Sequence, residues 1–328
     1  MTKIVKYFKG GSLSGTFVIK KKRKLIVRKQ VSLDHNREFG FQRWLSQLKK
    51  IQYYNSRIKN IFPDILDSGT LNQKTYFDIE YFKNYHNCFE TLNHKKKIDT
   101  KKLLTKILNK SNKLYRIKIP TVKNNIQLYF EEEINQRVKV LKRKINKNFF
   151  KNSHIYYNDE KVLHLHYQLK FLREIFLNHS NLINETFVHG NLTLENILYN
   201  GENVIFIDPY EENYIDTIYN DYSQILQSCN SNYESLNCSK FKVKKNEIFV
   251  NFKISKNMHS FNKLFKKYLL NKYNFNEIIL IRAFEVSQFI RMIPFKIAVN
   301  ENKAILFYGL ACKLIKDLKN DYKKKIKF

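Results

Sequence analysis

The pattern of hydrophobic and polar positions divides the chain into a strand-rich beginning and a longer helical remainder. Two β-branched runs, Phe17–Lys20 and Lys24–Val31, are separated by a short charged turn and predict two strands. Within residues 36–52 the apolar side chains recur at helical spacing, which predicts one helix. Two further runs, Phe62–Gly69 and Lys74–Phe82, predict two more strands. The N-terminal part is therefore expected to form a sheet with one helix.

From about residue 100 the apolar positions recur every three or four residues, which is typical of helices. Two short apolar runs interrupt this pattern and predict strands at Glu185–Val188 and Asn203–Asp208, the second ending in a carboxylate. The basic run Lys323–Lys327 is expected to fray. Helices are predicted within residues 101–115, 130–145, 164–179, 221–229, 260–270, 276–292 and 303–318.

Composition places the chain among globular proteins. It has 328 residues, of which 43% are hydrophobic and 15% aromatic, and this length is enough for more than one core. No apolar run approaches the ~20 residues needed to span a bilayer, and the N-terminus lacks the apolar stretch of a secretory signal. A cytoplasmic protein without a transmembrane segment is therefore expected. The four cysteines have no CxxC pairing and suggest neither a disulfide framework nor a zinc site; they are Cys88, Cys229, Cys238 and Cys312.

The net charge of +31 has two interpretations. One is binding to nucleic acid or to an anionic membrane surface. The other is codon bias, since the chain is rich in Lys, Asn and Ile, as an AT-rich genome produces. Because the lysines are spread along the chain and no helix-turn-helix, RRM or zinc pattern accompanies them, a nucleic-acid partner is not expected. A basic polyanion-binding protein remains an alternative.

The most informative stretch is 187–208, which reads as a loop, a short strand, a turn and a second strand. Such a hairpin can place Asn196 and Asp208 side by side. An amide oxygen and a carboxylate are hard ligands of the kind that Mg²⁺ takes alongside phosphate oxygens. His189, near the start of the loop, can fix the loop by hydrogen bonding to the backbone.

This stretch resembles the catalytic segment of the aminoglycoside and choline phosphotransferases. Protein kinases carry H-R-D-x4-N followed by D-F-G, and these relatives carry H-G-D-x4-N followed by I-D. The matching residues are His189, Gly190, Asn196, Ile207 and Asp208. The wider stretch HGNLTLENILYNGENVIFIDPY is most similar to a bacterial branch associated with capsule or surface-glycan biosynthesis. The similarity extends thinly over residues 10–318.

The resemblance implies an α+β, two-lobed protein-kinase-like fold. Residues 1–90 would form a small β-rich N-lobe with one helix that covers the nucleotide. Residues 91–328 would form a larger helical C-lobe, with the catalytic and metal loop 187–208 and a pocket for the acceptor. ATP, with GTP as an alternative, would lie between the lobes, and Mg²⁺ would be held by Asn196 and Asp208.

The N-lobe offers matching features for nucleotide binding. The densest cluster among the eight glycines, from Gly10 to Gly15, would cover the phosphates. Lys29 follows Leu25 and Val27 on one face of its strand and would contact the phosphates, as in the family's V-x-K. Backbone groups of the strand ending at residue 82 would bind adenine. The cofactor-binding residues are then Gly10, Gly11, Ser12, Ser14, Gly15, Lys29, Glu80, Tyr81 and Phe82.

Two positions depart from the family's pattern. The kinase helix normally supplies a Glu that pairs with the strand lysine, and the alignment places Gln47 there, which leaves the partner of Lys29 open. Asn191 stands where active relatives carry the catalytic Asp. An amide can orient a hydroxyl but cannot take its proton at neutral pH, and loss of a general base typically costs about 10²–10⁴-fold. Phosphoryl transfer depends largely on positioning and charge neutralisation, so activity need not be lost.

Three functions remain open. The first is an ATP-dependent phosphotransferase acting on a small-molecule hydroxyl of a sugar or glycan precursor, with Asn191 and His189 in the catalytic positions. The second is a nucleotide-binding pseudokinase or scaffold that partners a glycan-biosynthesis enzyme. The third is a protein that uses the fold for a different transfer reaction, or that binds a polyanion through its basic surface. The lysine-rich helical lobe suggests an acceptor carrying a phosphate or uronate, although a local acidic cluster stands at Glu211, Glu212, Asp216 and Asp221.

Overall fold

The computed structural model describes residues 3–8, 14–21, 23–33, 37–94, 96–121, 125–210 and 213–328. The chain forms two compact units and crosses between them several times. One unit comprises Met1–Thr91, Lys106–Ile117 and His189–Asn213, and the other comprises Leu92–Thr105, Lys118–Val188 and Tyr214–Phe328. All but the first two residues of the predicted catalytic segment 187–208 therefore belong to the same unit as the N-terminal sheet.

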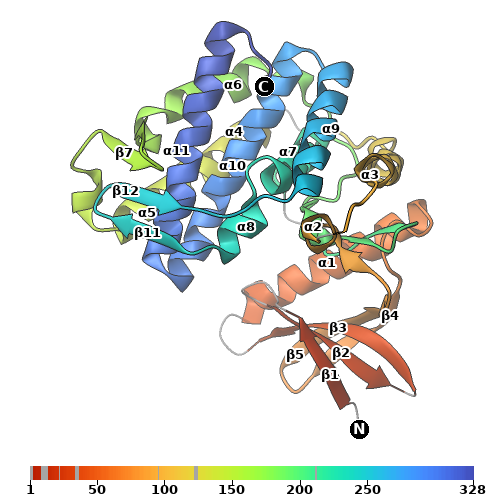
Figure 1. The fold of residues 1–328 in the computed structure, drawn as a ribbon. Coiled ribbons are helices and arrows are strands. Elements are labelled where there is room, and N and C mark those ends of the chain that lie inside the picture. The colour runs from red at the N-terminus through yellow and green to blue at the C-terminus, as the bar shows by residue number, and fades with distance from the viewer. Residues whose placement is uncertain are drawn as a thin grey trace. The chain divides into compact units, whose positions relative to one another are not determined.

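The first unit is built on a five-stranded antiparallel sheet with the order β1-β2-β3-β5-β4 (Figure 1). Its inner strands bury β-branched and aromatic side chains, among them Phe17, Ile19 and Ile26, because alternate residues of a strand share one face. Helix α1 (Arg37–Arg57) contacts β3, β4 and β5. The strands are β1 (Lys3–Phe8), β2 (Ser14–Lys21), β3 (Lys24–Ser32), β4 (Ile65–Leu71) and β5 (Lys74–Glu80).

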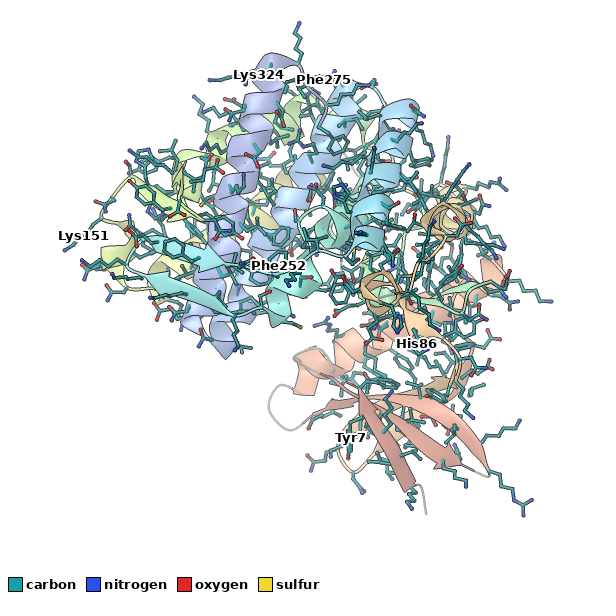
Figure 2. All side chains as sticks on the ribbon, viewed as in Figure 1. Tyr7, His86, Lys151, Phe252, Phe275 and Lys324 are labelled. Atoms are coloured by element: carbon teal, nitrogen blue, oxygen red, sulfur yellow. The ribbon has the colours of Figure 1, made fainter. Side chains whose placement is uncertain are left out.

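The edge strand β1 was not expected from the sequence. Its side chains are mostly exposed, with Tyr7, labelled in Figure 2, at 70%. Because neither face of β1 is buried, its residues show no alternation of apolar and polar positions from which a strand could be predicted. The other four strands and helix α1 agree with the predictions.

A second, three-stranded sheet of the same unit carries the predicted hairpin. Its order is β10-β9-β6, and β9 (Ile197–Tyr199) pairs antiparallel with β10 (Val204–Phe206). In the turn, Asn200 Oδ1 accepts from the backbone N–H groups of residues 202 and 203. Strand β6 (His86–Asn87) and helix α2 (Cys88–Asn93) precede it in the chain. The hairpin is confirmed, although its strands are short.

The second unit is mainly helical. Helix α10 is apolar around most of its circumference and packs against α5, α7 and α11, which explains why so much of it is buried (Figure 1). Helix α3 (Thr100–Tyr115) begins in this unit and ends in the first. The remaining helices are α4 (Asn125–Leu128), α5 (Gln136–Lys144), α6 (Leu169–Asn178), α7 (Ile218–Cys229), α8 (Tyr233–Cys238), α9 (Lys256–Lys272), α10 (Phe275–Val299) and α11 (Glu301–Lys324).

This unit also contains elements that the sequence did not predict. A four-stranded sheet has the order β11-β12-β7-β8. Tyr129–Asn135 forms a π-helix inside a predicted α-helix, and 3₁₀ turns occupy Lys147–Phe150, Leu165–Tyr167, Ser180–Leu182 and, in the first unit, Leu194–Asn196. The strands are β7 (His154–Tyr157), β8 (Glu160–Leu163), β11 (Phe241–Lys244) and β12 (Glu247–Val250).

The expectation that the basic C-terminal run frays was wrong. Helix α11 continues to Lys324, and Lys325 adopts a left-handed conformation that ends it. Beyond it, Arg282 donates to the carbonyl oxygen of Lys327, and Lys327 Nζ donates to the carbonyl oxygen of Tyr273. These contacts fix the run onto the helical unit.

The described residues include neither a disulfide nor a membrane-spanning helix. All four cysteines are free thiols, and only Cys238 is exposed. No helix in the described ranges is long and apolar enough to cross a membrane.

Candidate nucleotide and metal site

The loop after residue 188 is fixed from inside by His189. The ring is fully buried, its Nε2 donates to the carbonyl oxygen of Ile207 (3.0 Å), and its Nδ1 accepts from the N–H of Asn191 (3.1 Å). Burial, together with the nearby charge of Lys50, lowers the pKa of His189 to about 3. The imidazole is therefore neutral at pH 7, and it acts by positioning the loop.

Position 190 requires a glycine. Its φ of 79° is left-handed, and a Cβ added there would lie 2.3 Å from Asn213 Nδ2 and 2.7 Å from the carbonyl oxygen of Tyr210. Both the backbone conformation and the close approach of residues 210 and 213 therefore require glycine.

Asn191, Asn196 and Asp208 are linked by hydrogen bonds at the open end of the β9–β10 hairpin. Asn196 Nδ2 donates to the carbonyl oxygen of Asn191 (2.8 Å), and the N–H of Ile207 donates to the carbonyl oxygen of Asn196 (3.0 Å). Asn191 Nδ2 donates to the carbonyl oxygen of Asp208 (3.4 Å). The hairpin thus brings the loop residues 191 and 196 to the start of the segment that follows β10.

Asp208 joins this group to the N-terminal sheet. Its carboxylate Oδ1 forms an ion pair with Lys29 Nζ and accepts from Gln47 Nε2 (2.8 Å). The Asp208 side chain is 41% exposed, but nearby protein atoms partly desolvate the carboxylate, which opposes ionisation. The Lys29 ammonium and the Gln47 amide outweigh this effect, so the pKa of Asp208 is lowered. The carboxylate is therefore ionised at neutral pH. This ion pair identifies Asp208 as the partner of Lys29, which the sequence had left open.

Helix α1 holds the residues after Asp208. Gln47, only 7% exposed, donates to the carbonyl oxygen of Pro209 (2.7 Å), and Lys50 Nζ donates to that of Tyr210 (2.5 Å). The sequence marked Gln47 only as a departure from the kinase pattern. Its contact with Asp208 depends on a tertiary approach of residues 161 positions apart, which no local pattern encodes.

Arg28 lies on the opposite face of β3 from Lys29, because neighbouring residues of a strand point to opposite faces. It donates from Nε and Nη2 to the two oxygens of the buried Asp78 over 2.7 and 2.8 Å, and its guanidinium stacks 3.7 Å above the Tyr76 ring. This pair was not predicted from the sequence, although an Asp inside the apolar strand 74–80 is a signal for a buried cation partner.

Other predicted cofactor-binding residues are placed only in part. Gly10, Gly11 and Ser12 lie outside the described residues, and of Ser14 only the backbone is described. Gly15 pairs with Gln30 within the sheet.

The predicted adenine-binding segment, residues 80–82, begins at the last residue of β5. Glu80 pairs with Ile26, and Tyr81 and Phe82 come directly after the strand. The carbonyl oxygen of Phe82 accepts from the N–H of Tyr85 (3.1 Å). The chain therefore turns at residues 82–85.

The donor set fits a hard divalent cation. The Asn196 amide nitrogen is used by Asn191, which leaves the amide oxygen Oδ1 as a ligand. Among the described residues, the hydrogen bonds and the ion pair of the ionised Asp208 carboxylate fall on Oδ1, which leaves Oδ2 for a cation. One amide oxygen and one carboxylate, completed by water and phosphate oxygens, are typical of Mg²⁺. Two residues of the predicted acidic cluster, Glu211 and Glu212, lie outside the described residues. A third, Asp221, is buried within α7.

Comparisons with known proteins find similarity in structure and not in sequence. No protein-family model matches the chain, and no curated protein matches it by sequence. A thermostable mutant of aminoglycoside phosphotransferase APH(4)-Ia, in a ternary complex with AMP-PNP and hygromycin B, matches with a TM-score of 0.61 at 11% identity, covering 96% of this chain and 93% of that chain. A second structure of this phosphotransferase matches with a TM-score of 0.58 at 9% identity, covering 96% and 94%.

The chain therefore has the two-lobed, protein-kinase-like fold of the aminoglycoside phosphotransferases, with an antiparallel N-terminal sheet and a larger helical C-terminal part. The predicted fold class is confirmed. At this level of identity the match defines the fold, and the function has to be argued from the residues.

Proposed function

We propose that this protein binds ATP with Mg²⁺ and transfers the terminal phosphoryl group to a hydroxyl of a small molecule. The observation that carries the proposal is the convergence of Lys29, Asp208 and Asn196 in one unit, through the Lys29–Asp208 ion pair and the hairpin hydrogen bonds. A cation, an ionised carboxylate and an amide oxygen are what a metal-bound polyphosphate needs. A structural neighbour described as binding AMP-PNP supports the choice of nucleotide.

Each residue has a role in this proposal. Asn196 and Asp208 would hold Mg²⁺, which neutralises charge on the phosphate oxygens. Lys29 would contact the phosphates, and the segment Gly10–Gly15 would cover them. The backbone of residues 80–82 would bind the base. The lobes would divide near residue 90.

Asn191 would orient the acceptor hydroxyl. Its amide nitrogen donates to the carbonyl oxygen of Asp208, so its amide oxygen is the atom that can accept from a hydroxyl. It cannot take the proton, which would leave late in the reaction to water or phosphate. Phosphoryl transfer depends mainly on position and charge, so turnover would be reduced by the absence of a carboxylate without being abolished.

The acceptor is proposed to be a sugar-like alcohol. One neighbour is described as a complex with hygromycin B, and the catalytic segment resembles a branch associated with glycan biosynthesis. The large excess of Lys and Arg over Asp and Glu, 60 against 29, favours an acceptor carrying a phosphate or uronate group over a cationic one.

Formation of ADP in the presence of a panel of neutral and anionic sugar alcohols tests the proposal. We expect acceptor-dependent ADP formation by the wild type and a faster rate for Asn191→Asp, by about 10-fold or more, because a general base is supplied. ADP formation in neither protein, with nucleotide binding retained, would favour the second candidate, a nucleotide-binding pseudokinase. The observation that favours that candidate is Asn191 itself.

A further inference from the structure

Helix α1 presents two side chains to the segment that follows β10. Gln47 and Lys50 lie three residues apart, on one face of the helix, and donate to the carbonyl oxygens of Pro209 and Tyr210. Gln47 Nε2 also donates to Asp208 Oδ1. A primary amide nitrogen carries two N–H groups, so Gln47 can serve both acceptors at once.

Asp208 is a residue that needs such support. Its φ of 58° is left-handed, a conformation that residues with a Cβ rarely adopt. Its side chain is 41% exposed, so polar contacts orient the carboxylate more than packing does. Among the described residues, those contacts come from Lys29 on β3 and from Gln47 on α1.

The neutrality of Gln47 determines this arrangement. A glutamate has the same length, but when ionised it has no N–H to donate. Its carboxylate would face Asp208 Oδ1 and the carbonyl oxygen of Pro209, and like charges at this distance repel. The amide instead leaves Asp208 as the carboxylate that contacts Lys29.

We infer that Gln47 is a positioning residue for metal binding: it fixes Asp208 so that Oδ1 meets Lys29 while Oδ2 remains for the cation. The inference rests on the proposed function. It implies that a carboxylate at position 47, although it would match the kinase pattern, weakens the site. The amide is then part of a working arrangement and not a lost ion pair.

The test uses Mn²⁺ as the probe, with its affinity for the full chain measured by electron paramagnetic resonance in the presence of ATP. Gln47→Met keeps the length and removes the donor, and it should weaken Mn²⁺ binding by roughly 10-fold, as expected for a lost hydrogen bond to a charged group. Gln47→Glu should weaken it further. Gln52→Met and Gln52→Glu are the matched controls, since Gln52 is an exposed residue of the same helix, and they should leave the affinity unchanged.

A second readout separates positioning from general damage. Binding of ATP in the absence of metal should be retained in Gln47→Met, because Lys29 is untouched. If this variant does not fold, Gln47→Asn, which keeps the amide on a shorter side chain, takes its place with the same expected direction. Mn²⁺ affinity in Gln47→Glu equal to or above that of the wild type would overturn the inference. A wild type that binds no Mn²⁺ with ATP would overturn the proposed function itself.

Discussion

At the scale of single residues, His189 illustrates how burial makes a titratable side chain structural. Both ring nitrogens bind backbone groups, one on residue 191 and one on residue 207. The ring also meets Phe62 and Phe206 at centroid distances of 5.6 Å each. Any proton added to this ring would have to disrupt a hydrogen bond and place a charge in an apolar environment.

The low pKa of His189 predicts a specific pH dependence of stability. The unfolded state takes up a proton below about pH 6.5, and the folded state does not until about pH 3. The contribution of the neutral His189 ring to the free energy of unfolding is therefore fully present above pH 6.5 and is lost as the pH falls. Between pH 7.5 and 5 the free energy of unfolding should decrease by about 2 kcal/mol from this residue.

Urea unfolding at both pH values, on the wild type and on His189→Gln, measures this contribution. Other histidines with lowered pKa values, such as His164, contribute equally to both proteins, so the difference between them isolates residue 189. Equal pH dependence in the two proteins would contradict a neutral, buried His189.

At the scale of elements, helix α10 is the centre of the helical unit. Its side chains are buried on most sides. The ring of Phe289 packs against the ring of Phe307 of α11, with 6.0 Å between the ring centroids. Such a helix takes its stability from burial more than from amphipathic patterning or propensity. It packs against both α7 and α11.

Truncation on α10 should separate its buried face from its exposed end. Phe289→Ala, at a fully buried position, should lower the free energy of unfolding by about 3–5 kcal/mol. Phe295→Ala, on the same helix but 37% exposed, should cost far less. Chemical denaturation of the two variants makes the comparison, and similar losses would contradict the burial of Phe289.

Several elements were predictable and others were not, for physical reasons. The strands β2 and β3 were predictable from their β-branched runs, and helices such as α3 and α11 from apolar positions three and four residues apart. The β9–β10 hairpin has a turn signal between two apolar runs. Strands β7, β8, β11 and β12 have four residues each, too short for a period to emerge. Gln47 could be found as a departure, but its partner could not, because the contact joins a helix to a hairpin far along the chain.

At the scale of the whole molecule, the fold brings together what the sequence separates. Lys29, Gln47 and Asp208 come from a strand, a helix and a post-hairpin segment of one unit. Gln47 of helix α1 donates a hydrogen bond to the Asp208 carboxylate, and the same carboxylate forms the ion pair with Lys29. We propose that this arrangement binds a metal–nucleotide complex.

Calorimetry of ATP binding with and without Mg²⁺, on the wild type and on Asp208→Ala, tests that claim most directly. We predict Mg²⁺-dependent binding by the wild type and loss of the Mg²⁺ dependence in Asp208→Ala, because the variant lacks the charged metal ligand. Absence of ATP binding by the folded wild type, or Mg²⁺-dependent binding that is unchanged in Asp208→Ala, would contradict the account.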